Sequence, residues 1–215
     1  MTLRLLSNLA LAATFLTAAS PLVSQAVYHA EKSTLDLSLG AGLSNFDPGF
    51  AQGLPPGNEI HEGWGQGRMT GGTAWVNLGI PWNARWLRGL GFEGEYRTIL
   101  EGGSTGQSNI RESNLAGGAT YTLRHWNVVR PYAKYLFGYG EVSFAPVPEP
   151  DGTPYSQDSR GMNILGAGAE VRCTHHFWVR AEYDYESWGV LLGPHLQPQG
   201  VTVGAMYHLG SISWH

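Results

Sequence analysis

The sequence predicts an all-β fold, an antiparallel up-and-down transmembrane β-barrel of eight strands preceded by a cleaved signal peptide. Three observations lead to this prediction. Eight segments alternate apolar and polar residues, the connections between them are short and long in turn, and the chain begins with an apolar segment typical of export. Successive side chains of a strand point to opposite faces, and about ten alternating residues suffice to cross a bilayer.

The clearest alternation lies at 177–186. Its odd positions are apolar or aromatic, whereas its even positions from Arg180 to Glu186 are all charged. A strand with this pattern has one face that is apolar throughout and another that carries charges of both signs. The pattern therefore indicates a strand between two very different environments.

The first four predicted strands lie at 34–44, 70–80, 90–99 and 112–123. Their apolar faces are predicted to hold Leu35, Leu37, Leu39, Ala41 and Leu43; Ala74, Val76, Leu78 and Ile80; Leu90, Phe92, Tyr96 and Ile99; and Leu115, Ala119, Tyr121 and Leu123. The opposite faces are polar or glycine-rich, apart from Trp75.

The last four lie at 130–142, 165–172, 177–186 and 201–209. Their apolar faces are predicted to hold Pro131, Ala133, Tyr135, Phe137 and Tyr139; Leu165, Ala167, Ala169 and Val171; Phe177, Val179, Ala181, Tyr183 and Tyr185; and Val201, Val203, Ala205, Tyr207 and Leu209. Since proline has no amide proton to donate, Pro131 should lie near a strand end.

The connections also fit a membrane barrel. Those at 82–86, 124–128 and 173–176 are short, whereas those at 45–68, 100–109, 144–159 and 187–199 are longer. In barrels of this class the short turns face the periplasm and the long loops face outward. The tryptophans of the short turns, Trp82, Trp86, Trp126 and Trp178, suit a belt at the membrane interface.

The chain starts with features of an export signal. Arg4 precedes an apolar stretch at 5–16, and Ser24-Gln25-Ala26 provides small residues for a peptidase, so cleavage is predicted after Ala26, with Ala19 as the alternative. We therefore assign 1–26 to a signal peptide, 27–209 to the barrel and 210–215 to a C-terminal tail.

Composition excludes other classes. The mean hydropathy of −0.18 and the lack of a long apolar run beyond the signal exclude a helical membrane protein. A single cysteine, Cys173, excludes an intrachain disulfide. The formal charge of −4 and the absence of a basic patch argue against a nucleic-acid partner.

Alternation alone leaves open a soluble, lipocalin-like barrel whose apolar face points inward. The polar face, however, is rich in glycine and carries mixed charges, which favours a narrow lumen in which those charges pair. The predicted lumen charge network consists of Glu93, Glu95, Arg97, Arg130, Lys134, Glu170, Arg180, Glu182, Asp184 and Glu186. Glu112 and Arg172 belong to the same face.

Several sequence segments resemble those of a known family. Arg130-Pro-Tyr-Ala-Lys134, Trp178-Val-Arg-Ala-Glu-Tyr183 and the closing segment at 200–209 resemble the outer membrane protein β-barrel domain family, the porin-like, OmpA/OmpX-like eight-stranded barrels. The resemblance implies a place in the Gram-negative cell outer membrane, with membrane lipids, lipopolysaccharide and the assembly machinery as partners. The chain departs from the family pattern after Leu209, where six residues follow.

The preferred functional interpretation is a non-enzymatic barrel with a structural, envelope-integrity or surface-interaction role through its long loops. No catalytic residue, cofactor or metal ligand is predicted, and His175-His176 is interpreted as polar interface surface. One alternative is a barrel enzyme acting on lipid A or peptides, with His61 and His195 as candidate loop residues. The other is a small ion-conducting pore.

Overall fold

The computed structural model describes residues 34–49, 68–80, 87–101, 110–123, 128–148, 154–189 and 195–213. The compact unit Thr34–Ile212 contains the barrel and is described by itself. The predicted signal peptide, His61 and the tryptophans at 82, 86 and 126 lie outside the described residues. The described residues include no helix long and apolar enough to cross a membrane.

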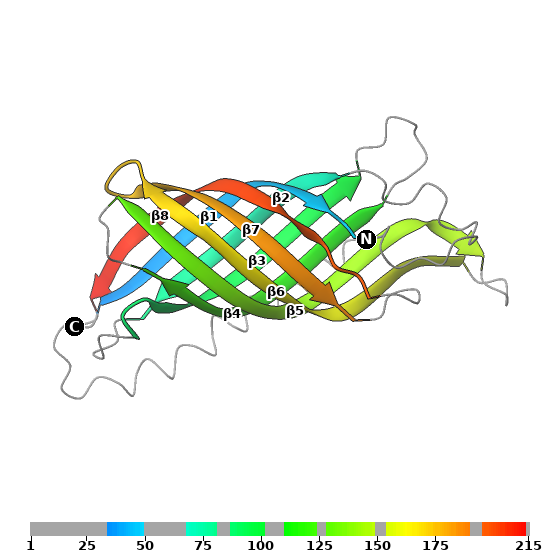
Figure 1. The fold of residues 1–215 in the computed structure, drawn as a ribbon, viewed down its shortest axis with the longest axis horizontal. Helices are drawn as coiled ribbons and strands as arrows, with labels where there is room; N and C mark the ends of the chain where they lie inside the picture. Colours follow the sequence, from blue (N-terminus) through cyan, green and yellow to red (C-terminus); the bar gives the residue numbers. More distant parts are fainter. Residues whose placement is uncertain are drawn as a thin grey trace. The chain divides into compact units, whose positions relative to one another are not determined.

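Eight antiparallel strands close into one barrel in sequence order, as predicted (Figure 1). The strands are β1 (Thr34–Asp47), β2 (Met69–Gly79), β3 (Leu90–Glu101), β4 (Arg111–Thr122), β5 (Val129–Pro148), β6 (Pro154–Arg172), β7 (Phe177–Trp188) and β8 (Gln199–Ser213). Because the strand number is even, β1 begins and β8 ends at the end of the barrel that carries the short β6–β7 turn.

The barrel closes where β8 meets β1, and small side chains make this seam possible. A Cβ atom added to Gly42 would lie 2.6 Å from the Val203 carbonyl oxygen, and one added to Gly204 would collide with the Ala41 carbonyl. Across the seam, the Ser44 and Thr202 hydroxyl oxygens lie 2.9 Å apart. Glycine and hydroxyl residues thus let the first and last strands approach closely.

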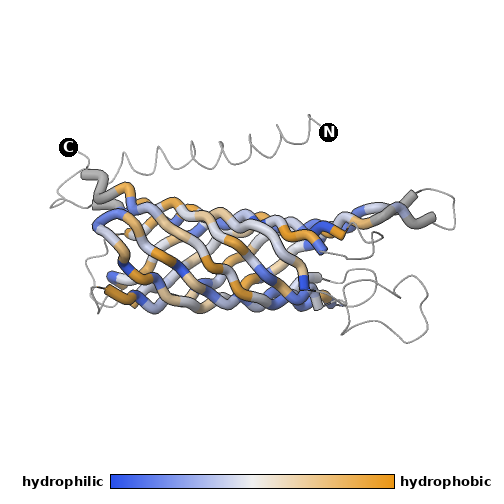
Figure 2. Tube along the Cα trace, turned by 90° about the horizontal axis from the view of Figure 1, so that it is seen from above, coloured by the Kyte–Doolittle hydropathy of each residue, from blue (hydrophilic) through white to orange (hydrophobic). Residues whose placement is uncertain are grey.

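The polar face points inward and the apolar face outward, which confirms the predicted orientation. Exposure alternates at every residue of β7, from exposed Phe177 to buried Trp188. The outer wall includes the exposed side chains of Leu39, Val76, Phe92, Tyr96, Leu115, Tyr135, Phe137, Tyr139, Leu165 and Val203. Figure 2 shows the same alternation as changing hydropathy along each strand. An inward-facing apolar wall, as in a soluble barrel, is excluded.

Three side chains differ from the prediction. Ile99, assigned to the apolar outer face, is 0% exposed and lies inside, whereas Leu100 is 54% exposed. The reason is strict two-residue alternation along β3, which places position 99 with Glu95 and Arg97. Trp178 is buried in the lumen rather than in an interface belt. Arg172 is exposed at the β6–β7 turn, where its guanidinium binds the Thr174 carbonyl and His175.

Three strands, β5, β6 and β8, extend well beyond their predicted ends. Most of the predicted 144–159 loop is strand, because β5 continues to Pro148 and β6 already begins at Pro154. The two form a hairpin that projects past the neighbouring strands, and pairing resumes at Val147 and Tyr155 after an irregularity (Figures 1 and 2). Outer edges of a two-stranded hairpin tolerate proline. Likewise, β8 continues past Leu209 to Ser213.

The outer wall predicts a charge-sensitive position at Phe137, whose side chain is 58% exposed in the middle part of β5. We expect Phe137→Arg to lower the free energy of unfolding in lipid vesicles by about 2–4 kcal/mol, because the guanidinium would face hydrocarbon. Phe137→Leu is the control and should change it far less. Equal stability of the two variants in denaturant titrations would contradict a lipid-facing wall.

Candidate functional site

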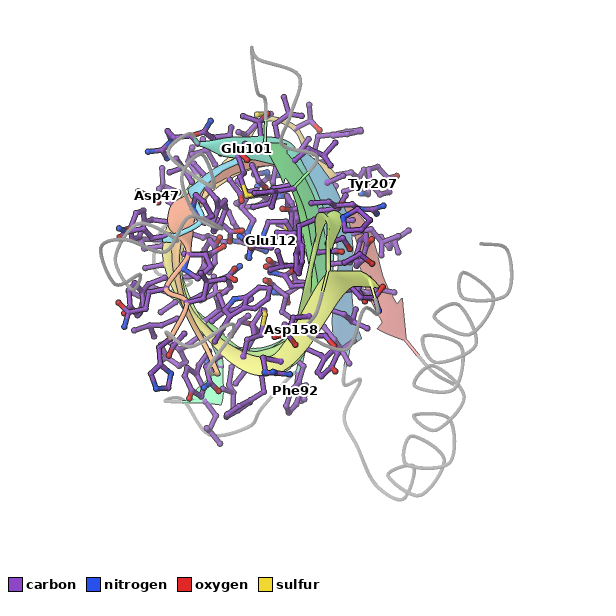
Figure 3. The ribbon with its side chains drawn as sticks, turned by 90° about the vertical axis from the view of Figure 1, so that its right-hand side faces the viewer. Asp47, Phe92, Glu101, Glu112, Asp158 and Tyr207 are labelled. Carbon is purple, nitrogen blue, oxygen red and sulfur yellow. The ribbon has the colours of Figure 1, made fainter. Side chains whose placement is uncertain are left out.

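The lumen is the candidate functional site, and it is filled with side chains. The inward row of β7 runs from Trp178 through Arg180, Glu182, Asp184 and Glu186 to Trp188, so charged residues lie between two tryptophans. Figure 3, a view along the barrel, shows Glu112 inside the ring of strands and Phe92 and Tyr207 outside it.

Arg180 is the centre of the first group of contacts. Its two terminal nitrogens lie 2.7 and 2.8 Å from the two carboxylate oxygens of Glu93, a bidentate arrangement. The same guanidinium donates to Glu182 at 2.6 Å. The Tyr132 hydroxyl also donates to Glu182 at 2.5 Å. The guanidinium carbon lies 4.4 Å from the Tyr132 ring centroid and 4.8 Å from that of Trp75.

Lys134 is the centre of the second group. Its ammonium nitrogen lies 2.5 Å from Glu95, 3.1 Å from Glu182 and 3.2 Å from Asp184. Oxygens of these three carboxylates lie within 4.8 Å of one another, a spacing that could hold a metal ion. The Lys134 ammonium already contacts all three carboxylates and neutralises part of their charge. A metal ion would have to displace this ammonium group.

Arg97 links the network to the outer part of the lumen, which is the end opposite the β6–β7 turn. Its guanidinium forms an ion pair with Glu186, and longer contacts of 3.6 and 3.7 Å join it to Glu95 and Asp184. The Trp188 indole donates to Glu186 at 2.7 Å. The Arg97 guanidinium carbon lies 3.7 Å from the centroid of the Phe46 ring. The charged network therefore ends against aromatic rings.

Apolar side chains fill the lumen beyond Arg97. This outer cluster consists of Phe46, Met69, Ile99, Ile110, Ala116, Leu136, Val142, Phe144, Met162, Ile164, Trp188 and Leu196, all buried. A smaller cluster of Trp75, Trp178 and Met206 lies toward the opposite end. The charges are thus enclosed between two apolar layers.

The structure brings eight of the ten predicted network residues into mutual ion-pair contact and places Arg130 and Glu170 toward the turn end of the lumen. Arg130 and Glu170 instead line a polar cavity of about 20 Å³, near the β6–β7 turn, together with Asp36 and His208. Arg130 stacks on Trp178 at 4.0 Å, and His208 Nδ1 lies 3.2 Å from Asp36. A cavity of that size accommodates a water molecule.

Sequence reasoning did not assign roles to Tyr132, Asn114 and Trp188. All three occupy inward positions, so strand parity could have identified them as partners of the lumen acids. His195 lies exposed at the other end of the barrel from His175 and His176, and its Nδ1 is 3.4 Å from the Trp188 carbonyl oxygen.

Comparison with known proteins identifies the family. The family model for the outer membrane protein beta-barrel domain matches residues 9–208. The chain belongs to that family. Membership of this family, together with the closed barrel fold, indicates that the protein is located in the outer membrane. No curated protein matches it.

Solved structures of other outer-membrane barrels share its fold. Neisserial surface protein A has a TM-score of 0.54 at 13% identity, covering 82% of this chain and 99% of its own. The Yersinia pestis attachment invasion locus protein Ail, solved with the heparin analogue sucrose octasulfate, has a TM-score of 0.50 at 16% identity. The match covers 83% of this chain and 100% of the Ail chain. A major outer membrane protein from Thermus thermophilus has a TM-score of 0.50 at 12% identity, covering 81% and 99%. None of these names describes an enzyme.

The contacts of Arg180 predict a large loss of stability on truncation. Arg180→Met would remove the bidentate partner of the buried Glu93 carboxylate and one of the three partners of Glu182, and we expect the free energy of unfolding in detergent micelles to fall by about 3–5 kcal/mol. Arg172→Met, at the exposed turn, is the matched control and should have little effect. Coinciding unfolding transitions for the two variants would show that the lumen contacts contribute little.

Proposed function

We propose that the protein is a non-conducting, non-enzymatic outer-membrane barrel that stabilises the envelope and makes surface contacts through its outward-facing end. The observation that carries the proposal is the filled lumen. A barrel of eight strands has an interior only wide enough for side chains, and here ion pairs and apolar residues occupy it. The role of the lumen charges is then structural.

The enclosure of the charges supports a closed lumen. An ion crossing the barrel would have to separate Arg180 from Glu93 and Lys134 from Glu95, and these contacts are direct and buried. It would also have to pass the outer apolar cluster, where Phe46 covers Arg97. The conducting alternative therefore lacks a supporting observation.

The projecting β5–β6 hairpin supports a role in surface contact. Its base is held by β4 and β7, which pair with the inner parts of β5 and β6. Loops on a rigid scaffold are common sites of recognition. The likeness to Ail shows the fold alone, so the proposal depends on the hairpin and not on what Ail binds.

Location and partners complete the proposal. Residues 1–26 act as the signal peptide, the apolar outer wall contacts outer-membrane lipids and lipopolysaccharide, and the assembly machinery inserts the barrel. A nucleic-acid partner is not proposed, because the chain carries a net charge of −4. No observation favours catalysis by His195 over a surface role.

Because the lumen is closed, the protein is predicted to conduct no ionic current in planar bilayers. We expect the wild type to give no sustained current, whereas Phe46→Ala combined with Trp188→Ala should produce openings, since both rings are removed from the outer cluster. Leu115→Ala combined with Tyr139→Ala removes similar volume from the outer wall and serves as the control. Steady single-channel current through the wild type would contradict the proposal.

The signal assignment predicts that protein purified from outer membranes begins at Val27. Amino-terminal sequencing measures this directly, and Gln25→Trp together with Ala26→Trp should block processing at this position. A mature chain beginning at Ser20 would place cleavage after Ala19 instead. An unprocessed N-terminus on membrane-inserted wild type would contradict the signal peptide.

A further inference from the structure

Glu112 has a buried carboxylate that accepts no hydrogen bond from the described part of the chain. It is the second residue of β4, points into the lumen and is 1% exposed (Figure 3). Among the residues that the structure describes, neither of its carboxylate oxygens has a hydrogen-bond partner. Its cross-strand neighbours are Ile99 on β3 and Val142 on β5, both fully buried and apolar. An ionised carboxylate is strongly unfavourable in such surroundings.

The nearby cation, Arg97, is shared among several carboxylates. Arg97 lies opposite Asn114, the next inward residue of β4, and its guanidinium contacts Glu186, Asp184, Glu95 and the Phe46 ring. The charged or titratable groups that the structure describes toward this end of the surrounding elements include Asp47 on β1, Arg68 before β2, Arg97 and Glu101 on β3, Lys134 and Glu141 on β5, Asp158 and Arg160 on β6, Asp184 and Glu186 on β7, and His195 before β8. Glu93 and Glu95 on β3, Arg130 and Tyr132 on β5, Glu170 on β6, and Arg180 and Glu182 on β7 lie farther along the same inward rows.

The charge balance of the lumen is already negative. Glu93, Glu95, Glu182, Asp184 and Glu186 share three cations, Arg97, Lys134 and Arg180, which leaves a surplus of two carboxylates. An ionised Glu112 would add another negative charge to a space closed by apolar residues. Burial away from water therefore opposes ionisation at this position, and the attraction of the shared Arg97 guanidinium does not offset it.

Asn114 supplies a second, independent observation. Its amide nitrogen donates to Glu186, but its buried Oδ1 receives no hydrogen bond from any described residue. A protonated carboxyl group has the O–H donor that an ionised one lacks. Within the described part of the chain, the three-carboxylate group suited to a metal lies around Lys134 and does not include Glu112. A proton is thus the ligand that fits.

We propose that Glu112 is a proton-binding site in the outer part of the lumen, where it is a neutral carboxylic acid at neutral pH. Alkaline conditions remove the proton and add an unpaired charge beneath the apolar cluster. In the unfolded chain the carboxyl group is hydrated and ionises readily. The folded state then binds one more proton than the unfolded state, so stability falls as pH rises over the range in which Glu112 keeps its proton.

Infrared spectroscopy of the full-length mature protein in lipid vesicles tests the proton directly. At neutral pH the wild type should show the C=O stretching band of a protonated carboxylic acid that Glu112→Gln lacks. Glu141→Gln, which changes a less buried glutamate on the adjacent strand, should retain the band. Absence of the band in the wild type, or an unchanged band in Glu112→Gln, would overturn the proposal.

Unfolding measured against pH gives a second readout. The ratio of the unfolding constants of wild type and Glu112→Gln should increase about tenfold per pH unit while folded Glu112 keeps its proton and the unfolded group is ionised. A ratio independent of pH would also overturn the proposal. If Glu112→Gln does not fold, Glu112→Leu serves in both experiments, because Ile99 and Val142 provide apolar surroundings for leucine.

Discussion

Burial of Arg180 inside the barrel is favourable only because Glu93 and Glu182 are buried with it. In lipid, every backbone donor and acceptor must be paired, and a closed barrel achieves this by leaving no free strand edge. Closure also leaves a narrow interior whose charged side chains have little access to water. The ion pairs of Arg180, Lys134 and Arg97 replace that water. The inward-facing charged residues of the alternating pattern can therefore be buried only because they form these ion pairs.

Glycine on the polar face gives the larger lumen side chains their space. A Cβ atom on Gly40 would collide with the Trp75 ring, and one on Gly140 would collide with the Trp188 ring. The two tryptophans belong to opposite apolar layers, so glycines at both ends of the lumen are needed to hold the charged residues between them. The glycine content of the inward face is thus a packing requirement.

Parity located the eight strands and put Arg180 and Glu182 on one face, and the loop lengths, the export segment and the mixed charges of that face were needed to predict a closed membrane barrel with that face inward. It could not predict that Arg180 binds Glu93, 87 residues away, because contacts across a lumen depend on strand stagger and barrel diameter. The misplacement of Ile99 arose from grouping residues by hydrophobicity where alternation was strict. The length of β5 was missed because its prolines favour a turn locally, whereas the paired strand β6 holds them in an extended hairpin.

The two ends of the lumen differ in the polarity of the side chains that line them. Near the β6–β7 turn, Arg130, Glu170, Asp36 and His208 line a polar cavity, and the His208–Asp36 contact joins β8 to β1 across the seam. At the other end the apolar cluster covers Glu112 and Arg97. Trp178, which stacks on Arg130 of that cavity, and Trp75, which contacts Arg180, lie between the cavity and the ion pairs. Glu112 lies beyond those pairs, opposite Ile99 and Val142 of the apolar cluster, so the environment that sets its protonation is that cluster rather than the polar cavity at the turn end.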